Sequence, residues 1–275
     1  MLADTPTRSP GLGSPGPGVL AQGTFLARVI DFIVEHLPSW RDNPDRPQVQ
    51  NEDELTDQLS TYLNSAARFS ALDYVQFRTE VPDSVNKRRS LDLAVQPCGQ
   101  PLIVEGRRYT LFDVLLPIEC KRLPTPGGHG RDEREYVSSG VSAGGIQRFK
   151  LGAHGSNHPL GVMIGYIQDD QPAYWLGAIN HWLLEAGETN VFWAGEQLVA
   201  ESTTGSVQRL RSTHRRSARG TSIELLHLWI SCGVAGPALA TARGSTSASA
   251  TSKVDAADSQ LLLTAPVAPK RRRRR

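Results

Sequence analysis

Three charged side chains stand in or next to apolar runs that have the pattern of β-strands, where burial makes a charge expensive. Glu119 and Lys121 follow the mostly apolar run 111–118, and Asp92 interrupts a second run, 91–95. A buried carboxylate or ammonium group is costly unless it is paired or bound to a metal. Side chains alternate along a strand, so Glu119 and Lys121 point to one face, and Asp92 can join them if the strands pair. Two carboxylates and a lysine at strand ends suit a hard-oxygen site for Mg²⁺.

A third carboxylate is expected from a helix that begins after Asn51. Asn51 suits an N-cap, and the acids Glu52, Asp53 and Glu54 occupy the first turn, where the helix dipole favours anions. Glu52 lies three residues before Leu55 and shares its inward face, whereas Glu54 points elsewhere. We therefore prefer Glu52 as the third carboxylate. The choice between Glu52 and Glu54 stays open, as does a role limited to satisfying the helix N-terminus.

Apolar periodicity indicates which elements position these residues. It predicts helices over 24–37, from 52 onward, within 132–149 and over 178–185, and strands over 75–81, 88–95, 111–123, 160–167 and 222–231. The mostly apolar run 111–123 favours a central strand buried on both faces, as in a sheet between helices. The order helix, three strands, helix, strand fits an α/β fold with a mixed sheet.

The order of acidic helix, Asp92 strand and Glu119-x-Lys121 strand resembles the PD-(D/E)xK phosphodiesterase superfamily of restriction-endonuclease-like nucleases. The resemblance covers roughly residues 50–170. It implies a mixed central sheet flanked by helices, and hydrolysis of DNA with Mg²⁺, for which Mn²⁺ can substitute. Asp92 and Glu119 are the expected metal ligands, and the resemblance adds the backbone carbonyl of Cys120. Lys121 is expected to contact the attacking water or the phosphate.

The chain departs from the family pattern in two places. The residue before Asp92 is Leu91 rather than proline, and the interval from Asp92 to Glu119 is long. An insertion must therefore stand between the two strands, and an extra hairpin at 104–109 would account for it. If the insertion belongs to the central sheet instead, Asp92 does not reach Glu119 and the metal site fails.

Polar and basic residues are candidates for contact with nucleic acid. The family often places a polar helix residue near the site, where Gln147 could hold the attacking water or a phosphate and Arg148 could contact phosphate bidentately. A solvated helix residue is the alternative for each. The net charge is only +2, so basic clusters would act locally or be plain solvated loops. The expected nucleic-acid contacts are Arg88, Arg89, Arg148, Arg215 and Arg216.

The histidines and cysteines predict no further site. His129, His154 and His158 lack the spacing of metal ligands and are expected to be loop residues, and His214 is a weaker candidate for DNA contact. An odd count of three cysteines without a CxxC pair predicts neither a disulfide framework nor a zinc motif, and favours a reducing, cytoplasmic location. Cys120 is expected to face the core.

Composition predicts one domain between two tails. Residues 1–22 are rich in Pro, Gly, Ser and Thr, and residues 236–275 form a Ser/Ala-rich linker that ends in an arginine run. Such segments bury too little apolar surface to offset their ordering entropy, so both are expected to be disordered. Residues 23–235 are expected to form the nuclease-like domain. No run of about 18 apolar residues is present, so no membrane span is expected.

The constellation favours a Mg²⁺-dependent endodeoxyribonuclease, with defence against foreign DNA or repair suggested by family analogy alone. Two other interpretations stay open: a non-catalytic nucleic-acid-binding subunit of a larger complex, and an interaction scaffold whose acids bind no metal. A homodimer is a further expectation, because cutting both strands at once needs two sites. The sequence contains no helix-turn-helix or zinc-finger pattern that would announce specificity.

Overall fold

The computed structural model describes residues 23–83, 89–125, 132–138, 144–216 and 221–233. The two tails expected to be disordered, residues 1–22 and 236–275, lie outside the described residues. Arg88 and His129 lie outside them as well.

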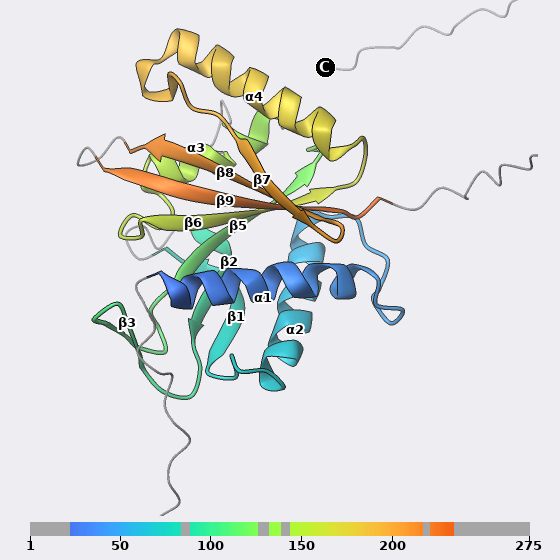
Figure 1. The fold of residues 1–275 in the computed structure, drawn as a ribbon, viewed down its shortest axis with the longest axis vertical. Helices are drawn as coiled ribbons and strands as arrows, with labels where there is room; N and C mark the ends of the chain where they lie inside the picture. The colour runs from blue at the N-terminus through green and yellow to red at the C-terminus, as the bar shows by residue number, and fades with distance from the viewer. Residues whose placement is uncertain (1–22, 84–88, 126–131, 139–143, 217–220, 234–275) are drawn as a thin grey trace, which may run out of the picture. The chain divides into compact units, whose positions relative to one another are not determined.

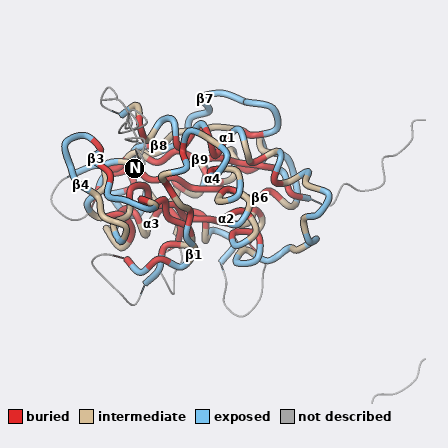
Figure 2. The backbone as a smooth tube through the Cα atoms, turned by 90° about the horizontal axis from the view of Figure 1, so that it is seen from below, coloured by how far each residue is buried: buried red, intermediate tan, exposed pale blue. Residues whose placement is uncertain are grey.

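The described chain is an α/β unit built on a mixed sheet of seven strands (Figure 1). In chain order these strands are β1 (Val75–Pro82), β2 (Ser90–Pro97), β5 (Leu116–Leu123), β6 (Leu160–Ile167), β7 (Val199–Thr204), β8 (Val207–Arg215) and β9 (Ser222–Ser231). Across the sheet their order is β1-β2-β5-β6-β9-β8-β7. The central strands β5, β6 and β9 run parallel, and antiparallel strands flank them on both sides. In Figure 2 the exposed strand β7 runs along an edge.

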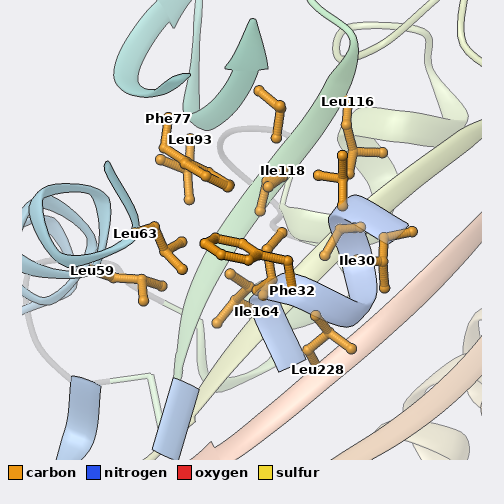
Figure 3. Close-up of a cluster of buried hydrophobic side chains, with 14 of the residues drawn as sticks. Ile30, Phe32, Leu59, Leu63, Phe77, Leu93, Leu116, Ile118, Ile164 and Leu228 are labelled. Carbon is orange, nitrogen blue, oxygen red and sulfur yellow. The ribbon is translucent and has the colours of Figure 1, made fainter. Parts of the chain in front are cut away.

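Helices cover both faces of the sheet. They are α1 (Thr24–Arg41), α2 (Glu52–Arg68), α3 (Gly145–Lys150) and α4 (Pro172–Thr189), with 3₁₀ turns η1 (Glu133–Tyr136) and η2 (Val191–Trp193). One apolar cluster joins α1 and α2 to the sheet through Phe32, Leu59 and Ile118 (Figure 3). A second cluster joins α3 and α4 to the opposite face through Phe149 and Ile179. The expected sheet between helices is therefore confirmed.

Strand β5 divides its side chains between the two layers. Ile118 and Cys120 are fully buried in the cluster beneath α1 and α2, which confirms that Cys120 faces the core. Because side chains alternate along a strand, Glu119 and Lys121 point to the opposite face, on the side of α3. Leu123 follows them there and packs in the second cluster.

The insertion between the two acid-bearing strands is a separate hairpin. Strands β3 (Leu102–Val104) and β4 (Arg107–Tyr109) pair with each other in a two-stranded sheet of their own. Strands β2 and β5 are therefore direct neighbours, with Leu93 opposite Ile118. The long interval between Asp92 and Glu119 does not separate them in space.

Two element predictions need correction. The strand expected over 111–123 begins only at Leu116, because Thr110 and Asp113 form a turn: the Thr110 N–H and hydroxyl each donate to the Asp113 carboxylate at 2.7 Å. Such local side-chain bonds compete with strand pairing. The helix expected within 132–149 is described as the turn η1 and the short helix α3, and residues 139–143 between them are outside the described residues.

Candidate active site

Three carboxylates and one lysine meet at the middle of β5. Nζ of Lys121 lies 2.7 Å from Oε1 of Glu52, 3.1 Å from Oε1 of Glu119 and 3.4 Å from Oδ2 of Asp92. It also donates to the backbone carbonyl of Cys120 at 2.9 Å. The Lys121 side chain is only 3% exposed, so these acceptors replace the water that its ammonium group loses. The structure thus brings four of the predicted site residues together.

Glu52 reaches the lysine because it opens α2. The Asn51 side chain caps this helix by accepting the Glu54 N–H at 2.7 Å, as the sequence pattern predicts. Glu52 points inward, where its second oxygen, Oε2, accepts the Arg122 N–H at 3.0 Å. Glu54 is exposed. Between these two candidates, Glu52 is the carboxylate that contacts Lys121.

Asp92 reaches β5 because the β2–β5 ladder stops beside it. The paired residues end with Leu93 and Ile118. Beyond that point the Cys120 N–H, which a longer ladder would have used, donates instead to Oδ2 of Asp92 at 2.8 Å. The parting of the two strands opens the sheet at the level of Glu119 and fixes the Asp92 carboxylate at the opening.

Glu119 is fully buried among Lys121, Arg148 and His154. Its Oε1 accepts from Nη1 of Arg148 at 2.5 Å, and its Oε2 lies 2.9 Å from Nδ1 of His154, although that pair is not aligned as a hydrogen bond. Burial by itself raises the pKa of Glu119. Lys121, His154 and Arg148 outweigh burial and lower the pKa to about 2, so the carboxylate is charged at neutral pH.

Burial and the neighbouring charges also shift the pKa values of Asp92 and Lys121. Burial, and then the negative charge of Glu119, raise the pKa of Asp92 to about 7, against the opposing effect of Lys121. Burial tends to lower the pKa of Lys121, but Glu119, Asp92 and Glu52 hold it well above its ordinary value. Lys121 is therefore a permanent cation in this site.

The cluster opens onto a cleft of about 710 Å³. Glu52 and Asp92 lie at its charged end, and Arg89, Arg148 and His154 also line it. Further acids along the cleft come from α2 and β1: Asp53, Glu54, Asp57 and Glu80. An anion entering this cleft meets mostly negative charge, so it needs added positive charge to bind.

The donor atoms fit a hard divalent cation. Asp92 faces the cleft, and Oε2 of Glu119 is a buried oxygen with no hydrogen bond. Carboxylate oxygens are what Mg²⁺ prefers, and one or two suffice because the ion keeps several waters. The carbonyl of Cys120, expected as a third ligand, accepts a hydrogen bond from Lys121. Within the parts of the chain that are described, no three His, Cys, Asp or Glu side chains form a ready-made metal cage.

Three of the predicted site residues do not line the cleft. The Gln147 side chain accepts the Gly144 N–H at 3.3 Å and lines a separate hollow with Arg134, so it does not line the cleft. Arg216 is 6% exposed, which leaves little of it for contact with DNA. Arg215 is exposed at the end of β8, and it is not among the cleft residues.

His154 is a site residue that the sequence pattern does not reveal. It lies in a loop without periodicity, where it was expected to be an ordinary loop residue, and it is 1% exposed against Glu119. Arg216 holds this loop by donating to the carbonyls of Gly155 at 2.7 Å and Ser156 at 2.8 Å. Gly155 has a φ of +57°, and a Cβ there would meet Pro117 at 2.8 Å. The sequence feature that could have indicated this site residue is the glycine that directly follows the histidine.

A buried chain of hydrogen bonds ties α3, the helix that carries Arg148, to the sheet. It runs in order through Trp229, Tyr136, His227, Ser212, His214, Glu196 and Lys150. Successive polar atoms are between 2.5 and 2.8 Å apart. Because Lys150 is the last residue of α3, the chain fixes the end of that helix.

The hydrogen positions in this chain follow from its two ends, the indole N–H of Trp229, which only donates, and the ionised carboxylate of Glu196, which only accepts. With both histidines neutral, the Tyr136 oxygen accepts from the indole and gives its own hydrogen to Nδ1 of His227. His227 then donates from Nε2 to Ser212, whose hydroxyl donates to Nε2 of His214. His214 donates from Nδ1 to the carboxylate of Glu196. Both histidines are neutral in this arrangement, and burial lowers the pKa of each.

The variant His227→Gln tests this assignment through pH. The pKa of folded His227 lies well below its ordinary value, so below pH ~6.5 the unfolded chain binds a proton that the folded chain does not. The stability advantage of the wild type over the variant should therefore shrink by up to about 1.4 kcal/mol per pH unit below ~6.5. Urea unfolding followed by circular dichroism at several pH values measures it. A constant advantage in acid would contradict a neutral His227.

Comparison with known proteins yields no relative, so the geometry of the site is the basis for assigning a function. No protein-family model, no curated protein and no solved structure matches the chain. Among the described residues, no helix has both the length and the apolar character that crossing a membrane requires.

Proposed function

We propose that this chain is a metal-dependent nuclease of the restriction-endonuclease-like PD-(D/E)xK type, which hydrolyses phosphodiester bonds of DNA. The observation that carries the proposal is the convergence of Glu52, Asp92 and Glu119 on the buried Lys121. Apart from the β3–β4 hairpin, the order α2, β1, β2, β5, α3, β6 is the helix, three strands, helix and strand on which the resemblance to that superfamily rests.

Hydrolysis requires neutralised charge on the phosphate, an oriented water and an in-line attack. Asp92 and Glu119 would hold Mg²⁺, which when bound supplies positive charge and lowers the pKa of a water. Lys121 is a donor rather than a general base, because its neighbours keep it protonated. It orients the water or a phosphate oxygen as a point charge. Glu52 fixes its ammonium group at 2.7 Å.

The acidic lining of the cleft favours this function over metal-free binding of nucleic acid. The cleft residues Asp53, Glu54, Asp57 and Glu80 would repel a phosphate backbone. A protein that only binds nucleic acid gains nothing from such acids. A protein that binds a divalent cation together with DNA uses these acids to attract the cation. Arg89 on the cleft wall is then the contact for the phosphate backbone.

Cleavage of supercoiled plasmid tests the proposal. Nicked or linear product should form with Mg²⁺ or Mn²⁺ and should be absent with EDTA. A panel of plasmid, linear duplex, single-stranded DNA and RNA extends the assay to the choice of substrate. Metal binding without cleavage of any of them would contradict nuclease activity, whereas binding of DNA alone would favour the non-catalytic alternative.

His154→Ala is expected to lower the cleavage rate by roughly 10- to 100-fold, the usual effect of removing a partner behind a metal-binding carboxylate. The reason is that Nδ1 of His154 lies 2.9 Å from Oε2 of Glu119, whereas Arg148 contacts Oε1. The measurement is the initial rate at saturating Mg²⁺. The control is His181→Ala, since His181 is exposed on α4 and pairs with Glu185. Equal rates for both variants would remove His154 from the site.

A further inference from the structure

Arg148 closes the carboxylate pair from the side of the cleft. Its Nη1 lies 2.5 Å from Oε1 of Glu119 and 3.9 Å from Oδ1 of Asp92, so one nitrogen faces both expected metal ligands. The Arg148 side chain is 23% exposed and lines the cleft, while Glu119 has no exposed surface. Arg148 therefore contacts Glu119 from a position on the cleft wall.

Two other groups beside Glu119 are more deeply buried than Arg148, since Lys121 is 3% exposed and His154 1%. Lys121 is bonded to Glu52 and to the Cys120 carbonyl, and His154 lies buried in a loop that Arg216 clamps. Arg148 reaches the cluster from the short helix α3, whose end is fixed by Lys150 while the guanidinium extends to the cleft surface. Because its side chain lines the cleft, Arg148 can meet a ligand that enters there.

A divalent cation between Asp92 and Glu119 competes with this contact. Positive charges repel strongly where water is scarce, so the cation binds weakly while the guanidinium stays. A phosphate in the cleft offers Arg148 another acceptor, and the planar guanidinium fork matches phosphate oxygens well. Movement of Arg148 to a phosphate would remove one of the two cations at Oε1 of Glu119 and leave Lys121 as the other.

We infer that Arg148 is a latch that DNA releases, and that it couples loading of the metal to binding of a phosphodiester backbone. In the absence of DNA the guanidinium neutralises Glu119 and Asp92 and weakens binding of the cation. When DNA enters, the same side chain turns to the backbone and the metal site opens. The inference rests on the proposed nuclease function and adds the order in which that site is filled.

Calorimetric titration with Mn²⁺ tests the latch without measuring cleavage. The full chain is titrated alone and with a short phosphorothioate duplex, whose linkages slow hydrolysis. In the wild type the duplex should tighten Mn²⁺ binding by about 10-fold, a typical size for coupled sites. By reciprocity, Mn²⁺ should tighten duplex binding by the same factor.

The variant Arg148→Met should bind Mn²⁺ without DNA about 10-fold more tightly than the wild type, and the duplex should add little. Arg148→Lys keeps the charge but loses the planar fork. Its coupling between Mn²⁺ and duplex binding should be intermediate between that of the wild type and that of Arg148→Met. Arg134→Met is the matched control, because Arg134 pairs with Glu185 and lines a different hollow. Circular dichroism checks that each variant is folded. If Arg148→Met does not fold, Arg148→Lys is the variant that tests the latch.

The outcomes separate the latch from the proposed function. Mn²⁺ binding that is equal with and without the duplex overturns the latch and leaves the metal site standing. Full wild-type coupling in Arg148→Lys overturns the role of the guanidinium fork. No Mn²⁺ binding by the wild type under either condition removes the metal site itself, and the latch with it.

Discussion

Glu119→Gln is expected to reduce metal-dependent cleavage of DNA by roughly 10³-fold, the scale on which single charge-stabilising groups act in active sites. The replacement keeps the shape of the side chain and removes its charge. An amide also brings an NH₂ group toward Arg148 or Lys121, which both present donors at this position. The variant therefore loses a ligand for the cation and disturbs the groups that surround it.

The same substitution should cost stability, and the assay must account for it. Removing one partner from a buried ion pair typically costs about 3–5 kcal/mol, and Glu119 is fully buried. Cleavage should be measured well below the unfolding temperature of the variant. Glu201→Gln is the control, because Glu201 pairs with Arg209 and Arg211 on the β7–β8 ribbon. Cleavage by Glu119→Gln within a few-fold of that control would exclude Glu119 as a ligand.

The parts of the site that follow a local period could be predicted from the sequence. The phase of the helix favours Glu52 over Glu54, and the alternation of side chains along a strand predicts that Glu119 and Lys121 share one face. Asp92 also met them, because the insertion forms its own hairpin instead of joining the sheet. Each of these inferences depends on a repeating backbone geometry over several residues.

The residues whose positions could not be predicted from the sequence lie where no hydrophobic periodicity fixes the direction of a side chain. Helix α3 has six residues, and one step along a helix turns a side chain by about 100°, so its phase was open. As a result Gln147 and Arg148 were equal candidates, and only Arg148 faces the carboxylates. His154 and Arg216 depend on a loop conformation held by long-range contacts. Short-range patterns do not encode such contacts.

The basic cluster on β8 shows the same limit on charge patterns. Arg209 and Arg211 belong to a basic run in the sequence, yet the structure pairs them with acids from other elements. Arg209 lies 3.0 Å from Asp31 of α1, and both arginines pair with Glu201 of β7. A run of like charge therefore does not establish a binding surface until its neighbours in space are known.

Lys121→Met should abolish cleavage and also change how the fold responds to metal. Without the lysine, Glu52, Asp92 and Glu119 lose the cation that they share, and at neutral pH the free energy of unfolding should fall by about 3–5 kcal/mol. A divalent cation can replace part of that charge. The variant should therefore gain more stability from Mg²⁺ than the wild type does, and saturation to about 100 times the dissociation constant adds roughly 2.7 kcal/mol.

Thermal unfolding with increasing Mg²⁺, and with EDTA as the reference, measures the difference. Lys150→Met is an informative control, because Lys150 is also buried and paired, but with Glu196 at the far end of the hydrogen-bonded chain. It should lose stability without a larger response to Mg²⁺. If both lysine variants respond to Mg²⁺ alike, the carboxylates around Lys121 do not form a cation site. A larger response in Lys121→Met alone, together with lost cleavage, would place the metal beside the lysine, because only there do three carboxylates share one cation.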